Sequence, residues 1–572
     1  MLKNAIAAYQ KGDHRQCLKL LAPSLSVARA DPKLLLMAAQ CHAKLENMEK
    51  AAELYARAAA VDPKSRRMLT LLAARTYQRA GQFEKALPLA RQAAGDGPFD
   101  IEAENTYRQV LRGQLVLAEM EAQDAHLLAL LKAGEAAAFA VDDPHDHLMW
   151  CDDEALNARI TRMHGGTAFT LPSRAARRSH PHVFADRIRI GYLSNDFADQ
   201  HATMRLLQGV LMLHDPARFD VTLFCYTPPG VIAHDQGLRQ RYGRIVPVAG
   251  LDDAAARTLI RSMGIDILVD LKGHTRDARV SLVNSGLAPI QVAYLGFPGS
   301  GTGIDCDYVI GDAVVTPDAS QPYYHEQICR LPESYQANDS LHRVLPPPAR
   351  RADLGLSDDA FVLASFNAVR KISTATARLW AEVLRGIPNG VLWMMCDDPG
   401  ARANFCAFMA DHGVAADRIV FAGRAAYPAH VARLQAADLA LDTFPTNGHT
   451  TTSDTLWAGL PVVTRRGHNF TSRVSESLLG AIGLSELVAE DDRAFVALCL
   501  ALASDRPRLD DLRKRLAANR LTAPLFDTER FTRHLERAFE MMVERHKAGL
   551  EPAPFDVPAL PARTTAFATS AP

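Results

Sequence analysis

The chain has 572 residues, which is too long for one hydrophobic core and implies three or four domains. Hydrophobic residues make up 48% and charged residues 23%, as in ordinary globular proteins, and the formal net charge of −1 gives no electrostatic case for nucleic-acid binding. The nine cysteines form neither a C-x-x-C pair nor a zinc-type His/Cys cluster, so we expect reduced, mostly buried thiols.

The sequence predicts no membrane span, because no uninterrupted apolar run approaches the length of a transmembrane helix. The first residues, Met1 to Ala5, lack the apolar core of a signal peptide. We therefore expect a cytoplasmic location.

A helical repeat occupies the first part of the chain. Segments that begin at Gly12, Glu46 and Gly81 occupy equivalent places about 34 residues apart, with Ala/Leu-rich amphipathic segments between them. Helix, short turn and helix at this period is the tetratricopeptide pattern, and alanines such as Ala51 and Ala86 let paired helices approach closely. We predict an all-α superhelix here, with residues 101–132 helical but off-consensus.

From residue 187 the pattern changes to short apolar strands that alternate with helical segments. The predicted strands cover residues 187–193, 219–226, 265–271 and 290–295 in one series and 361–366, 391–395, 419–421, 439–442 and 461–464 in another. This alternation predicts two parallel, doubly wound α/β sheets with helices on both faces, and a ligand cleft at the carboxyl ends of their strands.

The sequence thus divides into five parts. They are tetratricopeptide-like repeats (1–140), a linking helical segment (141–186), an N-terminal Rossmann-like half (187–345), a C-terminal Rossmann-like half (346–550) and a loose Pro/Ala-rich tail (551–572).

The most distinctive segment is the loop-to-helix run over residues 447–459. Here the imidazole of His449 and the hydroxyls of Thr450 and Thr451 meet backbone N–H groups at the positive end of a helix dipole. Such a loop suits phosphate or pyrophosphate. Asp454, one turn into the helix, is placed to accept hydrogen bonds from a ribose or to cap the helix.

Three more clusters of unusual residues follow predicted strands, and His430 and Arg433 lie one helix before the loop just described. The clusters are residues 195–197 with His201, residues 296–301 and residues 366–371. Alone, a lysine after a strand is usually solvated and a histidine is usually structural. Because all the clusters follow strand carboxyl ends, we expect them to form one site in the cleft.

These residues resemble the O-linked N-acetylglucosamine transferases, which are nucleotide-sugar enzymes that modify Ser and Thr of proteins. The matching motifs are SNDF with the later His201, API-Q with LG-F-PG (288–299), FN with Lys371, HV-x-R (430–433) and NGHTT-D-LWAG (447–459). The resemblance covers residues 187–549, and the short chain looks like a bacterial relative. It implies a GT-B fold, UDP-GlcNAc as donor, inversion at the anomeric carbon and no metal or other cofactor.

The resemblance also implies roles for individual residues, which charge considerations support. Lys371, with the loop from Gly448 to Thr451 and its N–H groups, would neutralise the negative charge that builds on the departing diphosphate. The other donor-binding residues that it implies are Asn367, Pro298, Gly299, His430 at the uracil, Arg433 beside it and Asp454 at the ribose.

The attacking hydroxyl must give its proton to a general base. His201, beside the sugar and diphosphate, is one candidate, and Asp196 acting through a water chain is another. His145 is a third, because the segment 145–150 loosely matches one that the family sends into the sugar pocket. The sequence leaves these three alternatives open.

We therefore predict a UDP-GlcNAc-dependent protein O-glycosyltransferase that needs no metal. The alternatives are another donor (GDP-fucose or a UDP-hexose), a small-molecule or glycan acceptor, or an inactive repeat scaffold that binds peptide. The repeats favour protein acceptors, since stacked helices form a long concave surface.

The D-x-D sequence Asp305–Cys306–Asp307 matches the metal motif of another glycosyltransferase fold, but it abuts a predicted strand and we assign no metal to it.

Overall fold

The computed structural model describes residues 2–26, 30–164, 169–233, 235, 237 and 239–568. The chain forms two compact units. One comprises Met1–Val141 with Cys396–Asp411, and the other comprises Asp142–Met395 with His412–Pro572.

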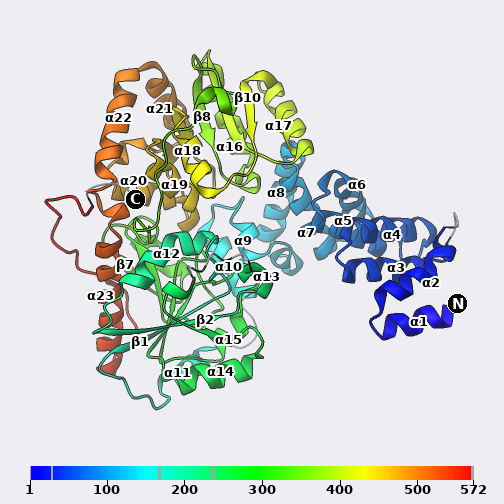
Figure 1. The fold of residues 1–572 in the computed structure, drawn as a ribbon, viewed down its shortest axis with the longest axis horizontal. Coiled ribbons are helices and arrows are strands. Elements are labelled where there is room, and N and C mark those ends of the chain that lie inside the picture. Colours follow the sequence, from blue (N-terminus) through cyan, green and yellow to red (C-terminus); the bar gives the residue numbers. More distant parts are fainter. Residues whose placement is uncertain are drawn as a thin grey trace. The chain divides into compact units, whose positions relative to one another are not determined.

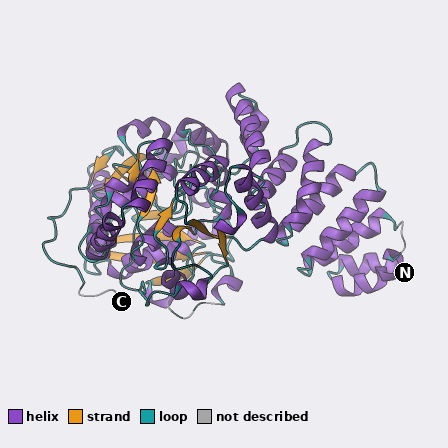
Figure 2. Cartoon of the chain, turned by 90° about the horizontal axis from the view of Figure 1, so that it is seen from above, coloured by secondary structure: helices purple, strands orange, loops and turns teal. Residues whose placement is uncertain are grey.

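The first unit is built from antiparallel helix pairs (Figures 1 and 2). Its helices are α1 (Leu2–Gln10), α2 (His14–Leu25), α3 (Pro32–Lys44), α4 (Met48–Val61), α5 (Arg66–Arg79), α6 (Phe83–Gly95), α7 (Ile101–Gly113), α8 (Leu117–Ala133) and α17 (Pro399–Asp411). Asp31 caps α3 by accepting a hydrogen bond from the Lys33 N–H. Ala51 and Ala86 are fully buried, as close helix approach requires.

The turns within the helix pairs explain where the repeat signal fades. Each has one residue in the left-handed region, at Gly12 (φ 76°), Glu46 (φ 62°), Gly81 (φ 72°) and Leu115 (φ 50°). Glycine adopts this conformation readily, so a turn without glycine is hard to see in a sequence. α7 and α8 therefore form a fourth pair at the same period. The prediction that residues 101–132 are helical is confirmed.

The second unit contains two parallel sheets, which are the orange strands in Figure 2. The strands of the first are β1 (Ile188–Ser194), β2 (Phe219–Cys225), β3 (Arg244–Pro247), β4 (Ile267–Asp270), β5 (Ile290–Ala293), β6 (Tyr308–Asp312), β7 (Gln327–Leu331) and β14 (Phe555–Asp556). Their order is β14-β7-β6-β5-β4-β1-β2-β3, and every pairing is parallel.

The second sheet repeats this plan in the order β10-β9-β8-β11-β12-β13, again with parallel pairings. Its strands are β8 (Phe361–Ser365), β9 (Gly390–Met395), β10 (Ile419–Ala422), β11 (Leu439–Leu441), β12 (Val462–Arg465) and β13 (Val488–Ala489). The predicted fold class, two doubly wound halves preceded by an all-α repeat region, is confirmed.

Helices join the strands and precede them. They are α9 (Pro144–His147), α10 (Glu154–His164), α11 (Leu171–Arg178), α12 (Ala202–Leu213), α13 (Pro229–Ile232), α14 (Asp253–Ser262), α15 (Val280–Asn284), α16 (Thr374–Gly386), α18 (Tyr427–Leu434), α19 (Thr450–Ala458), α20 (Val474–Ala481), α21 (Asp492–Ser504), α22 (Arg506–Asn519) and α23 (Thr528–Lys547). None of the helices in the described ranges is long and apolar enough to cross a membrane.

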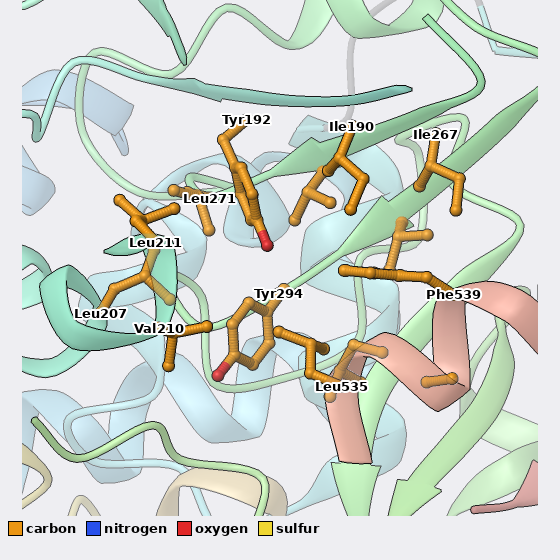
Figure 3. Close-up of a cluster of buried hydrophobic side chains, with 14 of the residues drawn as sticks. Ile190, Tyr192, Leu207, Val210, Leu211, Ile267, Leu271, Tyr294, Leu535 and Phe539 are labelled. Carbon is orange, nitrogen blue, oxygen red and sulfur yellow. The ribbon is translucent and has the colours of Figure 1, made fainter. Parts of the chain in front are cut away.

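The last long helix, α23, packs on the first sheet rather than the second. Its residues Leu535 and Phe539 lie in one buried cluster with Ile190 of β1 and Tyr294 after β5 (Figure 3). The sequence analysis assigned residues up to 550 to the C-terminal half, so this packing is a difference from that expectation. The chain thus returns to the first half after it completes the second.

The expectation of a loose tail after residue 550 is wrong. Residues Phe555–Asp556 form β14 on the edge of the first sheet, and the Leu560 N–H donates to His534 Nε2 at 3.0 Å. Arg530 in turn donates to the carbonyl of Leu560 at 2.7 Å. Scattered contacts of this kind leave no periodic pattern in a Pro/Ala-rich sequence.

Strand order defines where a ligand site should lie. In both sheets the chain reverses its direction of winding between the first and fourth strands, β1 and β4 in one half and β8 and β11 in the other. Loops at such a reversal diverge and leave a crevice at the carboxyl ends of the strands.

We predict that Gly296→Ala destabilises the second unit. A Cβ at Gly296 would lie 1.9 Å from the Leu271 carbonyl oxygen and 3.1 Å from the Lys272 Cα, and both are backbone atoms rather than the ends of flexible side chains. We expect a loss of about 3 kcal/mol or more in the free energy of unfolding. Gly250→Ala is the matched control, because nothing lies within 4 Å of its added Cβ. Melting of Gly296→Ala at the wild-type temperature, measured by calorimetry, would contradict the prediction.

Candidate active site

The predicted site residues of the two halves follow the strands that flank both winding reversals. Asp196 and His201 follow β1, whereas Asn367 and Lys371 follow β8 and His449 follows β11. Pro298 and Gly299 follow β5, one strand away from β4.

The loop before α19 is held by one buried carboxylate. Asp442, 1% exposed, accepts hydrogen bonds from the Thr443 N–H at 2.9 Å, the Gly448 N–H at 2.7 Å and the Thr464 hydroxyl at 2.7 Å. The Gly448 N–H donates to Asp442 and is therefore not available to a phosphate. This differs from the expectation that the N–H groups of the whole loop from Gly448 to Thr451 bind the anion. The N–H groups of the first turn, from Thr450 onwards, lack intrahelical partners and remain for an anion.

Lys371, which follows β8, places a positive charge beside this loop. Its Nζ donates to the Asn447 carbonyl at 2.6 Å, and burial lowers the pKa of the ammonium to about 8, while Asp442 opposes that shift. The side-chain oxygen of Asn367 is buried without a hydrogen-bond partner, and a Cβ at Gly448 would lie 3.2 Å from it. Lys371 and Asn367 therefore both lie against this loop.

His430 and Arg433 form a second group, on α18. The Arg433 Nε donates to His430 Nδ1 at 3.2 Å, and its guanidinium lies over the Phe366 ring at 4.4 Å. Burial, followed by the Arg433 charge, lowers the pKa of His430 to about 4. The imidazole is therefore neutral at physiological pH, which suits contact with an uncharged base.

Asp454 already has partners that the sequence reasoning missed. Its Oδ1 accepts from the Tyr427 hydroxyl at 2.9 Å, and the guanidinium groups of Arg343 and Arg205 lie 3.7 and 3.9 Å from its carboxylate oxygens. Arg205 also lies over the Tyr427 ring at 4.9 Å. A ribose hydroxyl at Asp454 would join or replace Tyr427. Tyr427 could have been found from the sequence, because it lies three residues before His430 and therefore on the same face of a helix.

His201 and Asp196 lie together in the first half. His201 caps α12, with its Nδ1 accepting from the Thr203 N–H at 3.3 Å, and its Nε2 faces Asp196 Oδ1 at 3.5 Å. Burial lowers the pKa of His201, and Asp196 opposes the shift. Lys272, which the sequence analysis did not single out, donates to the same Asp196 oxygen at 2.9 Å. Its place directly after a predicted strand was the only sequence signal.

His145 lies on α9, beside a cavity of about 270 Å³. The cavity is lined by Asp143, Pro144, His145, Asp146, His164, His274, Thr275, Arg276, Asp277, Ala278, Val280 and Arg370. Burial and the charges of Arg370, Lys371, Lys272 and Arg276 lower the pKa of His145 to about 3. His145 is therefore neutral at any working pH, within the electrostatic reach of Lys371.

The structure brings the remaining candidates to the same region. The Thr446 hydroxyl, in the loop before α19, donates to the Leu148 carbonyl at 2.7 Å, which ties the segment of His145 to the second half. A Cβ at Gly299, next to Pro298, would lie 3.8 Å from the Leu148 side chain. Burial holds the pKa of His449 well below its usual value, with Lys371 and His145 contributing.

Asp305 and Asp307 belong to an internal ion-pair network. Arg177 donates to Asp305 Oδ2 and to Asp307 Oδ1, each at 2.8 Å, and Arg174 donates to Asp305 at 3.1 Å. The D-x-D carboxylates are therefore paired with two guanidinium groups. In the parts of the chain that the structure describes, His, Cys, Asp and Glu side chains form no group of three placed for a metal ion.

Comparison with known proteins shows the family to which the chain belongs. The sequence model of glycosyl transferase family 41 matches residues 143–347 and 344–535, which is more than half of the chain. The chain belongs to glycosyl transferase family 41. The predicted resemblance to the O-GlcNAc transferases, as a bacterial-type homologue, is confirmed, and so is the glycosyltransferase class.

Curated relatives match about two thirds of this chain. The chain is 35% identical over 382 residues to the probable UDP-N-acetylglucosamine–peptide N-acetylglucosaminyltransferase SEC of Arabidopsis thaliana, covering 65% of this chain and 38% of that protein. It is 25% identical to the corresponding Caenorhabditis elegans transferase, covering 71% of this chain and 46% of that protein. The chain thus spans less than half the length of these relatives.

A solved structure matches nearly the whole chain. A mutant of the Thermobaculum terrenum O-GlcNAc transferase superposes with a TM-score of 0.65 at 25% identity, covering 96% of this chain and 97% of that one. The likeness extends over the repeats as well as both α/β halves.

In the ligand-free protein, Lys371 loses its proton as the pH rises above about 8. We therefore predict that UDP binds less tightly above this pH. A diphosphate beside the ammonium favours its charged form, so binding should take up a proton above this pH. Calorimetric titrations of UDP in two buffers of different ionisation enthalpy measure that uptake. Lys371→Met should remove it, and uptake that persists in this variant would assign the proton to another group.

Proposed function

We propose that this protein transfers N-acetylglucosamine from UDP-GlcNAc to Ser and Thr hydroxyls of proteins, with inversion at the anomeric carbon and without a metal ion. The observation that carries the proposal is the hydrogen bond from Lys371, which follows β8, to the carbonyl of Asn447 in the loop before α19, at the winding reversal of the second half. The membership of family 41 and the names of the relatives supply the donor and acceptor classes.

The leaving group would be stabilised by preorganised charge. In a direct displacement, negative charge grows on the diphosphate as the bond to the anomeric carbon breaks. The Lys371 ammonium and the first-turn N–H groups of α19 are fixed before the reaction, by Asn447 and by Asp442 acting on the loop. Little reorganisation would then be needed in the transition state.

The nucleoside would bind over α18 and the start of α19. His430 is neutral and held by Arg433, so its ring can contact a uracil without a charge penalty. Asp454 would accept from the ribose, in competition with the Tyr427 hydroxyl. This assignment favours uridine diphosphate over the guanosine diphosphate of a GDP-fucose enzyme.

The acceptor would approach through the cavity of about 270 Å³ beside His145 and Arg370. Its polar lining suits an extended peptide backbone, and the helical repeats would bind more distant parts of the same acceptor protein. His201, Asp196 and His145 remain the three candidates for the general base. In His201 both ring nitrogens are engaged, by Thr203 and Asp196, so proton acceptance at Nδ1 would require the Thr203 contact to open.

We predict that Lys371→Met slows sugar transfer about a hundredfold or more, since losing one preorganised contact to a developing charge costs on the order of 3 kcal/mol. Donor binding should weaken less, because the first-turn N–H groups of α19 still hold the diphosphate. Single-turnover transfer to a protein acceptor and calorimetry with UDP measure the two effects. Lys514→Met, at an exposed position on α22, is the control. A Lys371→Met enzyme within threefold of the wild type would exclude the leaving-group role.

We also predict that UDP binds more tightly than GDP, and that His430→Ala and Asp454→Ala each reduce this preference. Calorimetry with UDP, UDP-GlcNAc, UDP-glucose and GDP-fucose tests donor choice directly. GDP binding as tight as that of UDP would assign the chain to another donor. Tight donor binding without transfer to any protein would favour a small-molecule acceptor or an inactive scaffold.

A further inference from the structure

Lys272 forms a buried ion pair with Asp196, and the chemistry described so far gives this lysine no role. Lys272 is 6% exposed and Asp196 is 7% exposed, and Lys272 Nζ donates to Asp196 Oδ1 at 2.9 Å. A buried pair of this kind contributes little net stability, because the desolvation of both ions offsets their attraction. Its position at the winding reversal suggests a functional reason for it.

The lysine is placed by a rigid turn at the end of β4. The Asp270 carboxylate accepts from the N–H of Lys272 and from that of Gly273, each at 3.0 Å. Gly273 has a φ of 54°, and an added Cβ there would lie 2.6 Å from the Phe297 side chain. The turn therefore fixes the backbone from which the Lys272 side chain extends to Asp196.

The same carboxylate oxygen also faces His201. Lys272 Nζ at 2.9 Å and His201 Nε2 at 3.5 Å share Asp196 Oδ1, so the two nitrogens are no further apart than the sum of these distances. At this separation a positive ammonium strongly disfavours a second positive charge on the imidazole. Burial is the main influence that lowers the pKa of His201, Lys272 and Arg205 act in the same direction, and Asp196 opposes them.

The other ring nitrogen fixes the tautomer. A backbone N–H can only donate, so the contact from Thr203 to Nδ1 requires a lone pair on that atom. A neutral His201 must therefore carry its proton on Nε2, directed toward Asp196.

We propose that Lys272 is a positioning residue that acts through Asp196 to keep His201 neutral and protonated on Nε2. The role of His201 in turnover rests on the proposed function, but its protonation state does not. Lys272 balances the carboxylate, which would otherwise favour the imidazolium. It thereby keeps the lone pair of the imidazole on Nδ1, which can accept a proton from a substrate hydroxyl once the Thr203 contact opens.

The test is an NMR titration of the full-length protein with isotope-labelled histidine, in which His201→Gln identifies the signal. Removing the ammonium should let the imidazole charge more easily, so Lys272→Gln and Lys272→Met should raise the His201 midpoint by about one pH unit. Asp196→Asn should lower it, and Lys272→Arg should keep the wild-type value. Lys272→Gln retains a hydrogen-bond donor to Asp196, which preserves the fold if the methionine variant is unstable.

Arg174→Met is the matched control, since it removes a partly buried cation of the same half that pairs with Asp305. It should leave the His201 midpoint unchanged. The NMR chemical shifts of the two His201 ring nitrogens should show the proton on Nε2 in the wild type. An unchanged midpoint in both Lys272→Gln and Lys272→Met, or a proton on Nδ1, would overturn the proposal.

Activity separates this proposal from the proposed function. If His201 is the base, the acidic limb of the turnover profile should move to higher pH by the same amount as the NMR midpoint in Lys272→Gln, because the neutral form then appears at higher pH. A shifted midpoint in a protein that never transfers N-acetylglucosamine would leave the role of Lys272 intact and refute the function.

Discussion

The buried carboxylate of Asp442 is the interaction on which the second half of the site depends. It accepts hydrogen bonds from two N–H groups of its own loop and from the hydroxyl of Thr464 of β12. Burial raises the pKa of Asp442, and the hydrogen bonds oppose that shift. Because one end of the loop is fixed in this way, Asn447 can offer its carbonyl to Lys371 and the first turn of α19 stays open to an anion. A loop without this anchor would have to be ordered by the donor itself.

Desolvation sets the charge state of the site. The pKa values of His145, His430, His274 and His449 are all lowered chiefly by burial, so these rings are neutral near pH 7. The same effect lowers the pKa of Lys371 only to about 8, so it keeps most of its charge. The site therefore presents a localised positive charge among neutral imidazoles. That pattern suits a ligand whose diphosphate is charged while its base and sugar are not.

Local patterns in the sequence predicted the site's scaffold but not its internal partners. The central strands are short apolar runs, and residues such as Asn367 and His449 follow them directly, so their shared edge could be inferred. β3 and β7 were not among the predicted strands. Lys272, Arg205 and Tyr427 could not be assigned, since their partners lie 76, 249 and 27 residues away in the sequence. The commitment of the Gly448 N–H to Asp442 likewise depends on a fold that brings the two together.

Contacts between the two α/β halves bear on how the site can open. Arg343 donates to the Ser453 hydroxyl at 2.7 Å, and Ser477 of α20 donates to Asp312 of β6 at 2.7 Å, both in buried surroundings. α23 then packs its apolar face into the core of the first sheet. Separating the halves would expose these polar groups and part of that apolar face together, which carries a large free-energy cost. Local movement of side chains such as Tyr427 and Arg205 would therefore admit a donor at a lower free-energy cost than separation of the two halves.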